Sequence, residues 1–147
     1  MANLSTNLQR EDRVMHASPR AIVEDFFYRA GTGEPVEKIA ELVSEQVDWF
    51  VAGDTNVVPW IGRKVGKAGA AEFYAQIREQ IASEAFEVSE ILSQGNRVIA
   101  LGKLASRVVR TGKLIESEFC FDFIVENGEI TRFRLFEDSF AVAQAAA

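Results

Sequence analysis

The sequence has very few of the residues on which metal and thiol chemistry depend. Its 147 residues include one cysteine, Cys120, and one histidine, His16. A single cysteine cannot form an internal disulfide bond, which is typical of proteins from a reducing compartment. A zinc site of the usual kind needs more histidine and cysteine ligands than the chain has. We therefore expect a cytoplasmic protein without a metal or another cofactor, in which Cys120 is a structural thiol.

Positive charge is also scarce. The chain has 16 lysines and arginines against 22 acidic residues, so its net charge is −6. That sign repels the phosphates of nucleic acids. No apolar run approaches the ~20 residues that a membrane-spanning helix needs, and the opening MANLSTNLQREDRVMHA lacks the apolar core of a secretory signal. The composition therefore argues against both nucleic acid and membrane as partners.

What the sequence contains is the pattern of one α+β domain. Residues 1–16 are polar and aperiodic, which predicts a flexible N-terminal arm, and residues 17–147 predict a single domain. Ser18-Pro19 favours a helix start, because the hydroxyl can cap and proline suits the first helical position. The expected order is a helix to GTGE (31–34), a helix from Pro35, a strand over 47–51, a helix over 67–83, and strands over 85–94, 97–110, 113–126 and 129–137.

Alternation along the last strands predicts which side of the sheet faces the helices. One side carries Leu104, Ser106, Ser117, Phe119, Phe121, Phe123, Phe133 and Leu135. The other side carries Lys103, Arg107, Glu118, Asp122, Arg132 and Arg134. A register slip of one residue would bury the charged set, so the first set must point inward. Its aromatic side chains either form a packed core or line a pocket, and the two are compatible.

The order of elements, the segment VPWIGRKVGKAGAAEFY and the closing SEFCFDFIVENGEITRFRLFEDS resemble SnoaL-like, ketosteroid-isomerase-related proteins of the NTF2-like superfamily. The resemblance covers residues 18–145. It implies a cone-shaped α+β barrel, in which a curved, mixed or antiparallel sheet wraps around three helices and encloses an apolar cavity. It also implies a homodimer formed through the outer sheet face.

The loop over 53–66 then forms part of the cavity mouth, with Trp60 folded over it and Pro59 stiffening the turn. In that position Trp60→Ala should cost only about 1 kcal/mol of stability. Replacing a packed core tryptophan such as Trp49 with alanine should cost about 3–5 kcal/mol of stability.

The resemblance does not extend to two catalytic sets of the superfamily. Steroid isomerases use a tyrosine, a carboxylate base and a protonated aspartate. The matching positions here are Phe26, Val51 and Phe121. Epoxide hydrolases of the superfamily use an Arg-x-Asp and a second aspartate. Those positions are Gly102, Leu104 and Leu135. Neither named reaction is therefore assigned.

Two carboxylates remain as catalytic candidates, Glu137 and Asp54. Glu137 shares its side of the last strand with Phe133 and Leu135, and burial beside aromatic rings would raise its pKa. A solvated strand end is the alternative for Glu137, and a turn is the alternative for Asp54. Thr131 is a further inward polar candidate. The residues predicted to bind substrate are Trp49, Trp60, Phe27, Tyr28, Phe73, Leu104, Ser106, Ser117, Phe119, Phe121, Phe133 and Leu135.

Three functions stay open from the sequence. The first is an isomerase, cyclase or lyase that acts by acid–base chemistry on a small apolar or aromatic molecule. The second is a non-catalytic protein that binds or carries such a molecule, and the third is a dimerisation module with a filled cavity. A homodimer is expected because the outer sheet face mixes Phe136, Ile124 and Cys120 with charged residues, as partly polar interfaces do.

Overall fold

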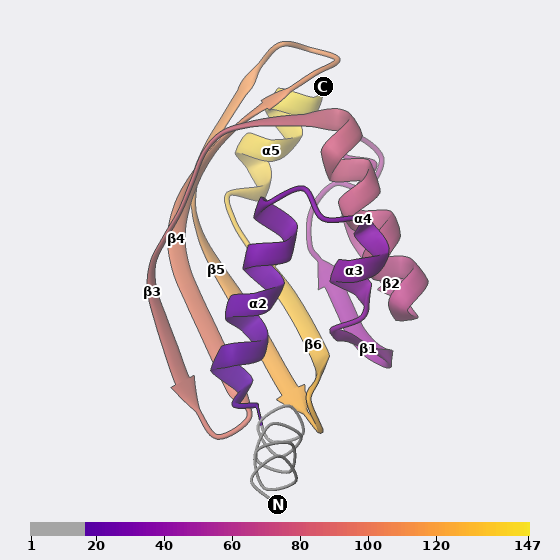
Figure 1. Cartoon of the computed structure of the whole chain (residues 1–147). Coiled ribbons are helices and arrows are strands. Elements are labelled where there is room, and N and C mark those ends of the chain that lie inside the picture. Colours follow the sequence, from indigo (N-terminus) through magenta and orange to yellow (C-terminus); the bar gives the residue numbers. More distant parts are fainter. Residues whose placement is uncertain (1–16) are drawn as a thin grey trace, which may run out of the picture.

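A curved six-stranded mixed sheet that packs against helices is the frame of the computed structural model, which describes residues 17–147 (Figure 1). The predicted N-terminal arm over 1–16 lies outside the described residues. The elements in chain order are α2 (Pro19–Gly31), α3 (Val36–Ala40), β1 (Val43–Val51), β2 (Gly62–Val65), α4 (Gly66–Gln80), β3 (Ile81–Gln94), β4 (Arg97–Val108), β5 (Leu114–Glu126), β6 (Glu129–Phe136) and α5 (Ser139–Ala146).

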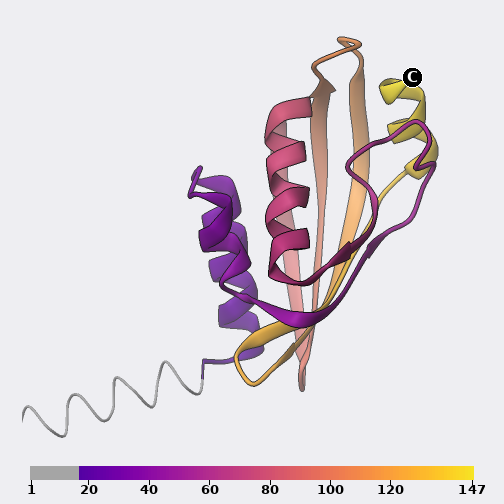
Figure 2. The same ribbon diagram turned by 90° about the vertical axis from the view of Figure 1, so that its right-hand side faces the viewer.

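The strand order β2-β1-β6-β5-β4-β3 makes an open sheet whose edges are β2 and β3. Among the strands of the described residues, only β1 and β6 pair in parallel, and the other neighbours are antiparallel. The sheet bends so that α2 and α4 lie on its concave side, while α5 lies at the end where β6 finishes (Figures 1 and 2). The predicted α+β class with a curved mixed sheet is confirmed, with the sheet left open.

Local signals account for several element boundaries. The hydroxyl of Ser18 accepts a hydrogen bond from the backbone N–H of Ala21 at 3.1 Å, with Pro19 in the first turn, so the predicted start of α2 is confirmed. At the other end of the chain, Asp138 caps α5 by accepting from the N–H of Ala141. Helix α5 was not predicted, because its alanine-rich sequence carries no clear apolar periodicity.

Several other boundaries differ from the prediction, since β1 begins at Val43 and not at residue 47, and β3 begins at Ile81 and not at residue 85. Helix α4 ends at Gln80 and the chain turns directly into β3, so the predicted helix over 67–83 is too long. Ile81 continues the four-residue spacing of Phe73 and Ile77, but it packs against the core from a strand. The predicted loop over 53–66 contains the short strand β2, which pairs with β1.

The core lies between the helices and the inner sheet face. Phe119, Phe121, Phe123 and Phe133 are buried, as the alternation predicted. Trp49 stacks on Phe133 with ring centroids 3.7 Å apart. Phe26 of α2 meets both rings and Phe123, so helix and sheet share one aromatic cluster.

Gly102 of β4 fills a crowded position in the sheet. A Cβ atom there would collide with the backbone oxygen of Glu87 and lie 2.5 Å from the ring of Phe119. The pairing of β3 with β4 is irregular next to this point, between Val88 and Glu90. The missing side chain therefore allows β3 to approach β4 closely, and Phe119 can stack on Phe86 at 4.9 Å.

Candidate ligand pocket

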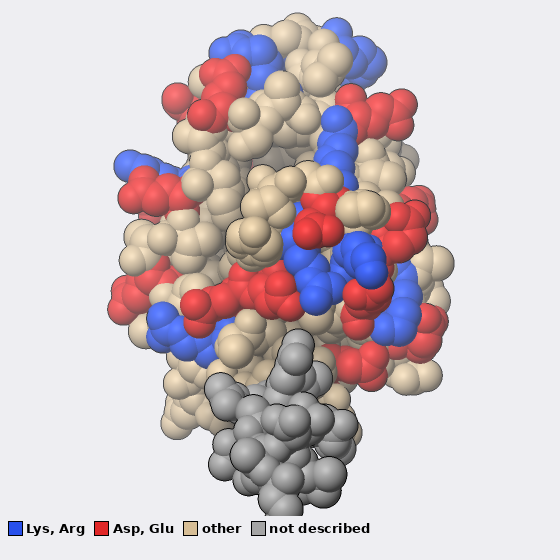
Figure 3. All heavy atoms as spheres, viewed as in Figure 1, with Lys and Arg blue, Asp and Glu red and all other residues tan. Residues whose placement is uncertain are grey.

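A pocket of about 460 Å³ lies between the inner sheet face and the C-terminal ends of α2 and α4. Figure 3 shows the surface hollowed above the top of α2, in the same view as Figure 1. The lining residues are Phe27, Ala30, Gly31, Val51, Trp60, Ile61, Phe73, Tyr74, Ile77, Arg78, Ile81, Ser83, Phe86, Leu104, Ser106, Ile115, Phe121, Leu135, Glu137 and Val142. Most are apolar or aromatic, so the pocket suits an apolar organic molecule.

The exposure of the lining residues separates the mouth from the deep wall. Gly31, Arg78, Ser83 and Phe86 line the pocket and are exposed, so the mouth lies between α2, the end of α4 and the start of β3. Seven of the described lining residues are buried. Val51, Trp60, Ile61, Ile115 and Val142 form the deep wall on the side of β1, β5 and α5, and the other two are Phe73 and Phe121.

Among residues 17–147, Glu137 is the only acidic residue that lines the pocket. It directly follows β6, where the alternation of Phe133 and Leu135 turns its side chain inward. Its neighbour Asp138 is held by a hydrogen bond from its backbone N–H to the hydroxyl of Ser117, 2.9 Å long. Burial raises the pKa of Glu137 from an ordinary value near 4.5 to about 7. Glu137 can therefore exchange a proton near neutral pH.

Two further ionisable residues line the pocket, and the sequence reasoning missed both. Tyr74 and Arg78 lie one helical turn apart on α4, beside Phe73 and Ile77. Burial raises the pKa of Tyr74, although the charge of Arg78 opposes the shift, so the phenol stays protonated and can donate a hydrogen bond. The signal was the i, i+1, i+4, i+5 spacing, which places all four residues along one broad face of the helix.

The pocket brings together eight of the predicted site residues. They are Phe27, Trp60, Phe73, Leu104, Ser106, Phe121, Leu135 and Glu137. Trp60 does not fold over the mouth, however. Its side chain is only 3% exposed, in a segment held by packing of Val58 and Ile61 against the core. The expected position of Trp60 was therefore wrong, because the short strand β2 pulls this segment onto the sheet.

The other predicted site residues do not line the pocket. Trp49 and Phe133 are fully buried in the aromatic cluster, and Phe119 is covered by Phe86. Tyr28 is 65% exposed, on the outer side of α2. Other side chains pack in front of Trp49, Phe119 and Phe133, and the helix turns Tyr28 outward.

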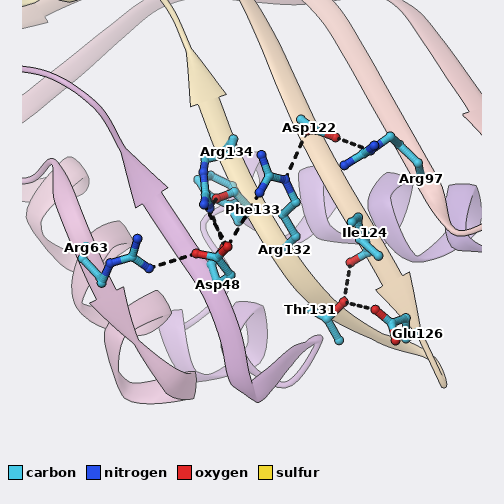
Figure 4. Close-up of polar contacts among 10 residues, drawn as sticks. All are labelled: Asp48, Arg63, Arg97, Asp122, Ile124, Glu126, Thr131, Arg132, Phe133 and Arg134. Atoms are coloured by element: carbon cyan, nitrogen blue, oxygen red, sulfur yellow. Dashed lines mark hydrogen bonds and ion pairs between the residues drawn. The ribbon is translucent and has the colours of Figure 1, made fainter.

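Three polar candidates also lie elsewhere. Asp54 is exposed and makes a turn, since its carboxylate accepts from the N–H of Asn56 and its carbonyl from Val57 and Val58. Ser117 holds the chain after β6 through Asp138. Thr131 points to the outer side, where its hydroxyl lies 2.9 Å from the carboxylate of Glu126 (Figure 4).

The outer sheet face carries a network of ion pairs around Asp48 (Figure 4). Hydrogen bonds from Arg134 and then Arg63 lower the pKa of Asp48 to about 2. Arg132 bridges to Asp122, which also pairs with Arg97 at 3.0 Å. These residues come from five strands, so the network links β2 to β4 across the sheet.

Among residues 17–147, no group of three or more His, Cys, Asp or Glu side chains is arranged to hold a metal ion. Within the same part of the chain, every helix is too short or too polar to cross a membrane.

The sequence and the fold were both compared with those of known proteins. A family model of the SnoaL-like domain matches residues 23–133. No curated protein matches the chain. An NTF2-like protein from Burkholderia xenovorans LB400 is 27% identical, with a TM-score of 0.79 over 88% of this chain and 95% of that one.

Two further solved structures are similar in fold. TerC co-crystallised with polyporic acid is 20% identical, with a TM-score of 0.73 over 87% of this chain and 97% of that one. A protein from Mesorhizobium loti, named as a SnoaL-like polyketide cyclase, is 18% identical, with a TM-score of 0.63 over 78% of this chain and 95% of that one.

Proposed function

This chain belongs to the SnoaL-like domain family, and on that premise we propose that it is an enzyme of the isomerase, cyclase or lyase kind. Its substrate is a small apolar or aromatic molecule that binds in the pocket and reacts by proton transfer. Glu137 is the general base. The observation that carries the proposal is the position of this single acid, in an apolar pocket that raises its pKa to about 7.

The chemistry of the pocket supports this role. A general base works best when its pKa lies near the working pH, because it is then both deprotonated and basic enough to remove a proton. In the reaction, the carboxylate of Glu137 takes a proton from a carbon next to an electron-withdrawing group. The negative charge moves to that group, and the neutral hydroxyl of Tyr74 is one donor in the pocket lining that can stabilise it.

The related structures agree with a small organic ligand. One is named as a polyketide cyclase and another was crystallised with polyporic acid, and both share the fold. These names describe the related proteins. For this chain, the ligand class rests on the apolar and aromatic lining of its own pocket.

A non-catalytic carrier is the second candidate, and a specific observation favours it. Val51 and Phe121 line the pocket with apolar side chains at two positions where the steroid isomerases carry acidic residues. A pocket with one acidic side chain where those enzymes have two has less acid–base chemistry, as expected of a binding site. The two candidates differ in what loss of Glu137 does to turnover.

Ring opening of nitrobenzisoxazole tests the proposed base, because this apolar aromatic compound needs only one proton removal. When a base takes its C–H proton, the N–O bond breaks and a nitrile and a phenolate form. We expect a rate that rises with pH and levels off above about 7, the pKa of Glu137. Glu137→Gln should abolish it, and the exposed control Glu116→Gln should not.

The carrier predicts a different result. Naphthylethanol, a neutral aromatic probe, should bind to the wild type and to Glu137→Gln alike under either function. If it binds and the wild-type protein does not accelerate the ring opening, or Glu137→Gln accelerates it equally, Glu137 is not a base and the carrier is correct.

A further inference from the structure

Arg78 lies at the mouth of the pocket, and only some of its hydrogen-bond donors have partners among residues 17–147. Its guanidinium donates to the backbone oxygens of Glu34 and Ala30, which hold it at the loop that follows α2. A guanidinium has five N–H donors, so most of them remain unused. No carboxylate of residues 17–147 forms an ion pair with Arg78.

The charge of Arg78 is separate from that of Glu137. Burial raises the pKa of Glu137. In contrast, the charge of Arg78 does act on Tyr74, one turn earlier on α4. The two groups also come from different elements: Arg78 lies in the last turn of α4, held by the loop after α2, whereas Glu137 lies between β6 and α5. Between them, the lining is apolar except for hydroxyl groups.

This distribution selects one class of ligand, and the inference rests on the proposed function. We propose that the substrate is an apolar or aromatic organic acid, whose carboxylate binds to Arg78 at the mouth while its other end reaches Glu137. Arginine binds a carboxylate with two parallel hydrogen bonds, which fixes orientation as well as adding affinity. A carboxylate at the far end would meet the negative charge of Glu137, so the reverse orientation is disfavoured.

The alternatives fit the two charges less well. An amine would be attracted to Glu137 but would have to pass Arg78 at the mouth. A neutral molecule would leave the guanidinium without a partner from the ligand. An organic acid satisfies Arg78 and leaves Glu137 free to take a proton from the far end.

Two probes with the same ring system test this inference. Naphthylacetate carries a carboxylate, and naphthylethanol is its neutral match. We expect the wild-type protein to bind naphthylacetate about tenfold more tightly, since a hydrogen bond to a charged group contributes well above a neutral one. The preference should decrease as salt is added, because the mouth is exposed to solvent. Calorimetry at pH 8 measures both affinities.

Variants of Arg78 locate the effect. Arg78→Gln should remove the preference for naphthylacetate and leave naphthylethanol binding within about twofold, which also shows that the pocket remains folded. Arg78→Lys should retain part of the preference, because the charge remains without the planar pair of donors. Arg20→Gln is the matched control, because Arg20 lies at the opposite end of α2 and does not line the pocket.

The outcomes separate this inference from the proposed function. If the two probes bind equally, or if Arg78→Gln keeps the preference, the organic acid is the wrong ligand class and the base Glu137 is unaffected. If Arg20→Gln loses the preference as fully as Arg78→Gln, general surface charge explains it and the inference fails. If neither probe binds, the pocket is not a ligand site, and the proposed function fails with the inference.

Discussion

Replacing Glu137 with glutamine should stabilise the protein in a way that depends on pH. The folded protein raises the pKa of this carboxyl from near 4.5 to about 7. Between these values the unfolded chain has already lost the proton that the folded chain still holds. Stability therefore falls as pH rises through this window, and the loss is complete above pH 7. Glutamine has almost the same shape and no charge, so it removes this loss.

The size of the effect follows from the pKa difference. One pKa unit corresponds to about 1.4 kcal/mol, so the half-buried carboxylate costs the wild-type protein up to about 3 kcal/mol at pH 8. For a domain of this length, that is a rise in melting temperature of about 10 °C for Glu137→Gln. At pH 4.5 Glu137 is protonated in the fold, and the two proteins should melt within about 2 °C of each other.

Thermal unfolding followed by circular dichroism between pH 4.5 and pH 8 measures this difference. The exposed control Glu116→Gln should change the melting temperature by little at any pH. If Glu137→Gln raises the melting temperature by the same amount at both ends of the range, or lowers it at pH 8, the carboxyl is not held in an apolar environment. The case for Glu137 as a base would then be refuted without any substrate.

Three further predictions concern packing and assembly. Trp60→Ala and Trp49→Ala should each lower the free energy of unfolding by about 3–5 kcal/mol in chemical denaturation, because both side chains are buried. A loss near 1 kcal/mol for Trp60→Ala would instead indicate that Trp60 lies at an open pocket mouth. Gly102→Ala should destabilise the protein by at least about 1–3 kcal/mol, since the added methyl meets the backbone of β3, and an unchanged melting temperature would contradict this. The homodimer remains a prediction: sedimentation at micromolar concentration should give a dimer, and Phe136→Lys on the outer sheet face should give a monomer.

Much of the frame was predictable from local sequence. Ser18-Pro19 marks the start of α2 because capping needs only neighbouring residues. The two faces of β5 and β6 follow from alternation, since a strand turns successive side chains to opposite sides. The same rule placed Glu137 on the inner side of the last strand.

The tertiary structure alone decided which inward residues face the pocket. Phe121 and Phe133 share the inner face, yet one lines the pocket and the other is covered by Trp49. Trp60 is buried because β2 pairs with β1, a contact between segments that no local pattern specifies. Arg78 reaches the mouth because α4 ends beside the loop after α2. Sequence periodicity determines which side of an element is apolar. The space left between elements depends on their packing across long stretches of chain, and that space is where the chemistry lies.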